Sequence, residues 1–130
     1  MSSANRTLNI AIGQLNPIVG DVAGNLERAR LARRESAGVA ADLLVLTELF
    51  ISGYPPEDLV WRPAFVDACR DAISRLASDT ADGGPAVLIG SPWVERDRLF
   101  NSVLLLDGGS VAAVRHKVDL PNYGVFDEMR

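Results

Sequence analysis

The sequence of 130 residues contains one cysteine, Cys69, and one histidine, His116. A lone cysteine excludes a disulfide within the chain, and together the two residues supply too few ligands for a structural zinc site. No apolar run approaches the roughly 20 residues that span a bilayer, and residues 1–9 do not resemble a secretory signal. We therefore expect a cytoplasmic protein that has no metal site in this chain and does not associate with membranes.

The charged and glycine residues exclude two further classes of partner. The net charge is -4 and both signs are mixed along the chain, so no basic stripe is available for nucleic acid. The glycines form neither a G-x-G-x-x-G motif nor a P-loop, so we expect no nucleotide or other cofactor to bind this chain. An apolar fraction of 48% is enough for the core of one domain, and no linker divides residues 1–130.

Lysine occurs once, as Lys117, whereas every other basic side chain is an arginine. An ammonium is a compact point charge, but a guanidinium is a wide planar fork, so the two are not interchangeable. The lone lysine therefore hints at a position where arginine would not serve. A lysine exposed on the edge of a sheet is the plainer interpretation.

The first half of the chain has the pattern of a strand–helix–strand unit. Apolar runs predict strands over residues 8–15 and 42–46, with a helix over 22–39 between them. Four apolar residues recur at helical spacing on one face of that helix: Val22, Leu26, Ala29 and Ala32. The charged residues of this segment, Arg33 among them, are expected on the solvent side.

The second half continues with a helix and then changes character. A helix is predicted over residues 64–77, with Cys69 on its apolar stripe, followed by a strand over 86–90 and a loop at Pro92 and Trp93. Strands over 100–106 and 111–118 are joined by a glycine-rich turn, which predicts an antiparallel hairpin. Only two long helices are available to cover parallel strands, so we expect an unfinished α/β domain.

The apolar strand 42–46 runs directly into Thr47 and Glu48, which places Glu48 at the carboxyl end of the sheet. Open α/β folds bind their ligands at this edge, and a buried carboxylate there is suited to proton transfer. A solvated residue at the end of a strand is the alternative. Cys69 is best interpreted as a small core residue, and His116 as a strand residue with no partner evident from spacing.

Three blocks of sequence resemble the nitrilase superfamily of carbon–nitrogen hydrolases. They are IAIGQLNP with the following Gly-Asp (residues 10–21), residues 42–54, and residues 115–128. Within that superfamily, GYPPEDL (53–59) and LPNYGVFDE (120–128) resemble the glutaminase domain of bacterial glutamine-dependent NAD synthetases. The resemblance implies an α-β-β-α four-layer sandwich, of which residues 1–130 would form the N-terminal part, incomplete at the C-terminus.

The resemblance also implies roles for five residues of this chain. Glu48 corresponds to the general base, and Lys117 to the residue that stabilises the oxyanion. Glu128 corresponds to a second, supporting glutamate, while Tyr123 and Phe126 fall where part of the glutamine pocket is expected. Thr47 departs from the proline that often precedes the base, which affects the expected shape of the loop rather than the role of Glu48.

The implied reaction is hydrolysis of glutamine to supply ammonia for ATP-dependent amidation of nicotinic acid adenine dinucleotide to NAD. ATP and magnesium would bind a synthetase domain that is absent from this chain, and the protein is expected to form homo-oligomers. The nucleophilic cysteine of the family lies beyond residue 130, and Cys69 matches no catalytic block, so we expect these residues alone to be inactive. Two alternatives stay open: part of another amidase or carbamoylase, and a non-catalytic remnant or module that binds a partner.

Overall fold

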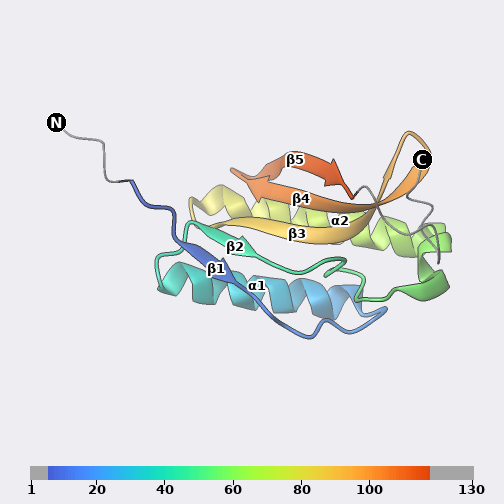
Figure 1. Ribbon diagram of the computed structural model, residues 1–130, viewed down its shortest axis with the longest axis horizontal. Helices are drawn as coiled ribbons and strands as arrows, with labels where there is room; N and C mark the ends of the chain where they lie inside the picture. The colour runs from blue at the N-terminus through green and yellow to red at the C-terminus, as the bar shows by residue number, and fades with distance from the viewer. Residues whose placement is uncertain (1–5, 118–130) are drawn as a thin grey trace.

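The computed structural model describes residues 6–117, which form a five-stranded sheet with two long helices (Figure 1). The strands lie in chain order across the sheet: β1 (Ile10–Ile12), β2 (Leu43–Val45), β3 (Ala86–Glu95), β4 (Arg98–Asp107) and β5 (Ser110–His116). The helices are α1 (Val22–Gly38) and α2 (Pro63–Asp79), with short 3-10 turns η1 (Glu57–Trp61) and η2 (Thr80–Asp82). None of these helices is long and apolar enough to cross a membrane.

The topology confirms the predicted βαβ pattern followed by a hairpin. Strands β1, β2 and β3 are parallel and are connected through α1 and α2, whereas β4 runs antiparallel to both of its neighbours. Both helices lie side by side on the same face of the sheet (Figure 1). Because β4 is antiparallel to both β3 and β5, strand β5 runs in the same direction as β2 and β3. The carboxyl ends of these three strands therefore lie at one edge of the sheet.

Strand β3 is longer than predicted, and the loop expected at Pro92 and Trp93 is wrong. Both residues continue β3 and pair with Asn101 and Phe100 of β4. Among residues 6–117, β2 pairs with β3 only as far as Leu88, so the missing N–H of Pro92 leaves no bond of the β2 ladder unmade. The chain turns instead at residues 96–97, which both have positive φ, as a two-residue hairpin loop requires.

The core forms between the two helices and the sheet. The predicted stripes are confirmed: Leu26, Ala29 and Ala32 of α1 are buried, as are Cys69 and Leu76 of α2. Strand residues that point toward the helices, including Leu44, Val87 and Leu106, complete the same cluster. Burial of these apolar side chains is the main force that fixes the positions of the strand ends.

Arg33 corrects the expectation that every charged residue of α1 faces solvent. Its side chain is buried and donates hydrogen bonds to both carboxylate oxygens of Asp82, at 3.0 and 2.7 Å, and to the carbonyl of Pro85 at 2.8 Å. The hydrogen bond from Arg33 lowers the pKa of Asp82 to about 2. Helical spacing alone did not reveal these contacts, because Asp82 and Pro85 lie 49 and 52 residues further along the chain.

The opposite face of the sheet has no helix on it among residues 6–117. One row across this face aligns Ile12, Val45, Leu88, Leu105 and Ala113. These side chains are apolar and incompletely buried, and Ile12 is 72% exposed. One layer of helices and one sheet with an apolar open face are two adjacent layers of the predicted sandwich.

Candidate active site

The candidate site lies at the edge where β2 and β5 end. Glu48 is the third residue after the end of β2, and Lys117 follows the last residue of β5 directly. The intervening strands β3 and β4 hold these ends at a fixed separation through a continuous antiparallel ladder. The predicted placement of Glu48 at the carboxyl edge of the sheet is therefore observed, and the sheet brings Lys117 to the same place.

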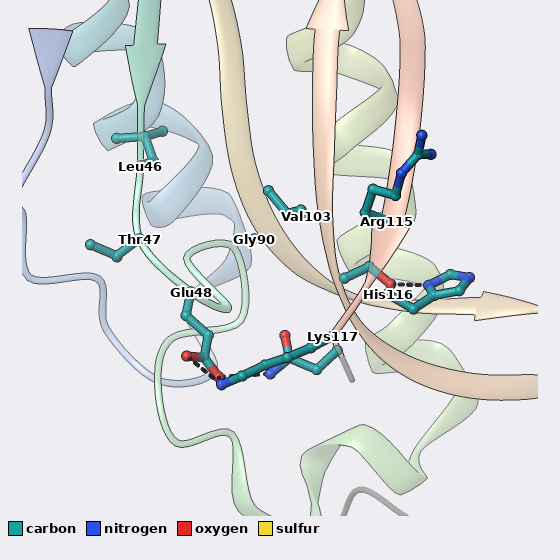
Figure 2. Close-up of a pocket in the computed structure, with 10 residues that line it drawn as sticks. Leu46, Thr47, Glu48, Gly90, Val103, Arg115, His116 and Lys117 are labelled. Atoms are coloured by element: carbon teal, nitrogen blue, oxygen red, sulfur yellow. Dashed lines mark hydrogen bonds and ion pairs between the residues drawn. The ribbon is translucent and has the colours of Figure 1, made fainter. Parts of the chain in front are cut away.

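Glu48 and Lys117 are in direct contact, as Figure 2 shows. The Nζ of Lys117 lies 3.1 Å from Oε1 and 3.0 Å from Oε2 of Glu48, although the two residues are 69 positions apart. Both side chains are 41% exposed, so Glu48 lies at a solvated strand end, one of the two environments that its position in the sequence left open.

Asn101 of β4 joins this pair and was not identified from the sequence. Its side-chain Nδ2 donates a hydrogen bond of 2.7 Å to Oε2 of Glu48, and its backbone carbonyl accepts one of 2.8 Å from the N–H of Lys117. The residue is only 5% exposed. The asparagine in the predicted strand 100–106 was the available signal, since a polar residue in a buried strand needs a partner.

A cavity of about 310 Å³ opens beside the pair. Its lining comes from β3, β4, β5 and the loop after β2: Leu46, Thr47, Glu48, Gly90, Asn101, Ser102, Val103, Arg115, His116 and Lys117. A second hollow of about 300 Å³ lies on another side of Glu48 and is lined in part by Tyr54. Volumes near 300 Å³ are at the lower end of those that bind small molecules.

Gly90 allows the loop that contains Glu48 to approach the sheet closely. A Cβ atom at position 90 would lie 2.3 Å from the backbone nitrogen of Leu49 and 2.8 Å from the carbonyl oxygen of Thr47. Leu49 itself has a φ of 52°, so the chain bends sharply directly after Glu48. Contact with backbone atoms on both sides fixes the direction in which the carboxylate points.

We predict that Gly90→Ala destabilises the fold and displaces Glu48. The added methyl group meets backbone atoms that cannot rotate away, and overpacking of this kind costs about 1–3 kcal/mol. The measurement is the free energy of unfolding in urea for Gly90→Ala and for a control, Gly38→Ala. At position 38 an added Cβ atom meets nothing within 4 Å. Equal free energies of unfolding for the two variants would contradict this account of Gly90.

His116 has partners that the sequence spacing did not reveal. Its Nδ1 lies 2.7 Å from Oγ of Ser102, its Nε2 lies 2.7 Å from Oε1 of Glu95, and its ring stacks on Phe100 with centroids 3.9 Å apart. These contacts tie the end of β5 to β3 and β4. His116 therefore fixes the backbone immediately before Lys117.

Cys69 occupies the position predicted for a core residue. Its thiol is fully buried within the cluster between α2 and the sheet. Burial raises its pKa to about 12, which suppresses the thiolate that nucleophilic attack requires. Cys69 is a structural residue and does not line the cavity beside Glu48.

We expect Cys69 in the folded protein to resist thiol reagents. With a pKa about 4 units above pH 8, on the order of one thiol in ten thousand is ionised, and the core blocks access. Ellman's reagent at about pH 8 should detect one thiol in 6 M urea and almost none in buffer. A full equivalent that reacts within seconds in buffer would show that the thiol is accessible.

Three predicted site residues, Tyr123, Phe126 and Glu128, lie outside the described residues 6–117. Their predicted roles stay predictions. Glu48 and Lys117 are thus the two sequence candidates that the structure brings together.

The sequence matches the model of a known family and resembles several curated proteins. Residues 9–129 match the family described as carbon-nitrogen hydrolase. The glutamine-dependent NAD(+) synthetase of Thermotoga maritima is 40% identical over 126 residues, which cover 96% of this chain and 22% of the relative. That of Rhodobacter capsulatus is 42% identical over 121 residues, covering 93% and 22%. The chain thus spans about a fifth of the length of these relatives.

Solved structures show the same fold. A glutamine-dependent NAD(+) synthetase from Cytophaga hutchinsonii superposes with a TM-score of 0.83 at 27% identity, covering 95% of this chain and 21% of that one. One from Acinetobacter baumannii, in complex with ADP, gives 0.81 at 31% identity, covering 92% and 22%. An amidase from Nesterenkonia sp. gives 0.74 at 29% identity, covering 88% and 44%. These neighbours confirm the predicted fold class.

Proposed function

Because the chain belongs to the carbon–nitrogen hydrolase family, we propose that Glu48 and Lys117 are the acid–base and oxyanion-stabilising residues of an amide-hydrolysing site. The observation that supports this most strongly is the contact of Lys117 Nζ with both Glu48 oxygens, at 3.1 and 3.0 Å, beside the cavity. A carboxylate and an ammonium held together at a strand edge provide a base and a positive charge within reach of one small molecule.

The proposed substrate is glutamine, and the proposed parent protein is a glutamine-dependent NAD synthetase. Two lines of support are the relatives named so at 40% and 42% identity and the structural neighbours of the same name. The ammonia would serve the ATP-dependent amidation of nicotinic acid adenine dinucleotide. ATP and magnesium would bind a synthetase domain outside this chain. The sequence of residues 1–130 has no phosphate-binding glycine loop. Assembly into homo-oligomers in the cytoplasm is part of the same proposal.

In the proposed reaction Glu48 accepts the proton of a cysteine thiol, and the sulfur attacks the side-chain carboxamide carbon of glutamine. Lys117 stabilises the negative oxygen of the tetrahedral intermediate. Glu48 then returns the proton to the leaving nitrogen as the C–N bond breaks, which releases ammonia and leaves a thioester. Water that gives a proton to Glu48 hydrolyses the thioester to glutamate and restores the thiol.

The nucleophile of this reaction cannot be Cys69, which is buried in the core and has a raised pKa. A solved structure of a mutant of the Nesterenkonia amidase, at 28% identity, shows the acetamide moiety of fluoroacetamide added covalently at the active-site cysteine of that protein. We propose that the corresponding cysteine lies outside these 130 residues. The chain alone is then inactive, because no thiol is available to form the acyl-enzyme.

Ammonia release tests both the activity and its substrate. The 130-residue chain should release none from glutamine above a Glu48→Ala control, whereas the longer synthetase should hydrolyse glutamine in preference to simple aliphatic amides and N-carbamoyl amino acids. The fold shared with an amidase favours one alternative, a free-standing amidase. Preference for simple amides would support that alternative, and ammonia released from glutamine by the chain alone would overturn the proposal about the nucleophile.

A further inference from the structure

Asn101 contacts both members of the Glu48–Lys117 pair, and we infer that it is a positioning residue that selects the oxygen of Glu48 that accepts the proton. This inference rests on the proposed amide-hydrolysing function. The inference gives Asn101 a role in the proposed reaction beside Glu48 and Lys117. It also assigns proton transfer to one atom, Oε1 of Glu48.

The two oxygens of Glu48 differ in their hydrogen bonds. Oε2 accepts from Nδ2 of Asn101 at 2.7 Å and from Nζ of Lys117 at 3.0 Å, whereas Oε1 accepts from Lys117 at 3.1 Å. An ionised carboxylate oxygen has room for about two donors. Among the contacts of residues 6–117, Oε2 is therefore fully used, and Oε1 keeps the lone pair that a thiol or a water can approach.

The position of Asn101 is fixed before any substrate binds. The residue lies within β4, where it pairs with Pro92 of β3, and it is 5% exposed. Its carbonyl accepts the backbone N–H of Lys117 at 2.8 Å, so the residue that orients the base also fixes the backbone at the lysine. A carboxylate only accepts hydrogen bonds, so the NH₂ group of Asn101 must be the part that faces Glu48.

The geometry distinguishes this role from simple filling of the core. A hydrogen bond from a neutral amide to a charged oxygen is short and among the stronger ones in proteins. Its loss would leave the half-exposed Glu48 side chain free to rotate around its contact with Lys117. The carboxylate would still be present, but its basic oxygen would point toward the nucleophile for only part of the time.

The test measures glutaminase kinetics in the proposed full-length synthetase with Asn101→Ala, Asn101→Asp and Asn101→Gln. We expect Asn101→Ala to lower kcat by about 10- to 100-fold and to change KM by less than about threefold, because the lost bond orients the base rather than the substrate. Asn101→Asp should lose more, because its carboxylate competes with Glu48 for Lys117. Asn101→Gln, which keeps the donor on a longer stem, should recover part of the loss.

Ser91→Ala is the matched control. Ser91 is a fully buried polar residue of β3 and lies close to Asn101 in the sheet. The hydroxyl of Ser91 donates a hydrogen bond to the carbonyl of Pro92 and not to Glu48. Its kcat should stay within about twofold of wild type. If Asn101→Ala does not fold, Asn101→Asp and Asn101→Gln, which are closer in size to asparagine, still give the comparison.

Two results would overturn the inference while the proposed function stands. One is a kcat within about twofold of wild type for Asn101→Ala and Asn101→Asp when Glu48→Gln is inactive. The other is an equal loss in Ser91→Ala, which would mean that any disturbance of the sheet lowers the rate. By contrast, wild-type activity in Glu48→Gln would refute the proposed function itself.

Discussion

Glu48→Gln in the proposed full-length synthetase is expected to lower the kcat for glutamine hydrolysis by roughly 10³- to 10⁴-fold, the upper range for loss of a general acid–base residue. The carboxamide keeps the size of the side chain but has no basic oxygen. Each of the proposed proton transfers, from the thiol, to the departing ammonia and from water, uses the same carboxylate. A steady-state assay of ammonia release at saturating glutamine measures the effect.

The control for this variant is Glu27→Gln. Glu27 is also an exposed glutamate in an ion pair, with Arg30 at 2.9 Å on α1, and it does not line the cavity beside Glu48. Removal of the Glu27 charge should leave kcat within about twofold of wild type, since exposed ion pairs contribute little to stability. Retention of most activity in Glu48→Gln would remove the basis of the proposed reaction.

Lys117→Arg should lower kcat by about 10²- to 10³-fold although the charge is kept, a loss similar to removal of one oxyanion donor. The ammonium of Lys117 presents a compact charge to both oxygens of Glu48, at 3.1 and 3.0 Å. A guanidinium is wider and planar, so it cannot occupy the same point without displacing Glu48 or filling the cavity. KM should change less than kcat if the charge acts mainly on the transition state.

Arg115→Lys serves as the opposite exchange, in β5 two residues before Lys117. The Arg115 side chain lines the cavity, but it donates a hydrogen bond to the backbone carbonyl of Val114 and not to Glu48. This variant should lose far less activity than Lys117→Arg. Equal losses from both exchanges would indicate that the cavity requires bulk and charge in general rather than an ammonium at position 117.

The sequence predicted the presence and order of the strands and long helices better than it predicted the surroundings of the site. Apolar runs identified every strand and both long helices, because burial against one face imposes a simple period on residues such as Leu44 and Cys69. Glu48 was evident because it comes at the end of the apolar run of β2, and Lys117 because it is the single lysine among 13 lysine and arginine residues. The sheet then brought them together as its topology requires.

Contacts between distant side chains could not be predicted in this way. Asn101 meets Glu48 across 53 positions and Arg33 meets Asp82 across 49, and neither pair has a local pattern. The hairpin turn at residues 96–97 was missed because it contains no glycine, whereas Pro92 suggested a break that the one-sided pairing of β3 does not need. The sequence left the exposure of Glu48 open, because the position of a residue at a strand end does not specify which other segments cover its side chain.

A double-mutant cycle on glutamine hydrolysis tests the central claim that Glu48 and Lys117 act as one unit. The measurement compares kcat/KM for wild type, Glu48→Gln, Lys117→Met and the double variant of the full-length protein. If the pair acts together, the double variant is about as slow as the slower single variant, since residues of one catalytic unit are strongly non-additive. Losses that multiply would show that the two residues act independently, and no loss in either single variant would contradict an amide-hydrolysing site at this edge of the sheet.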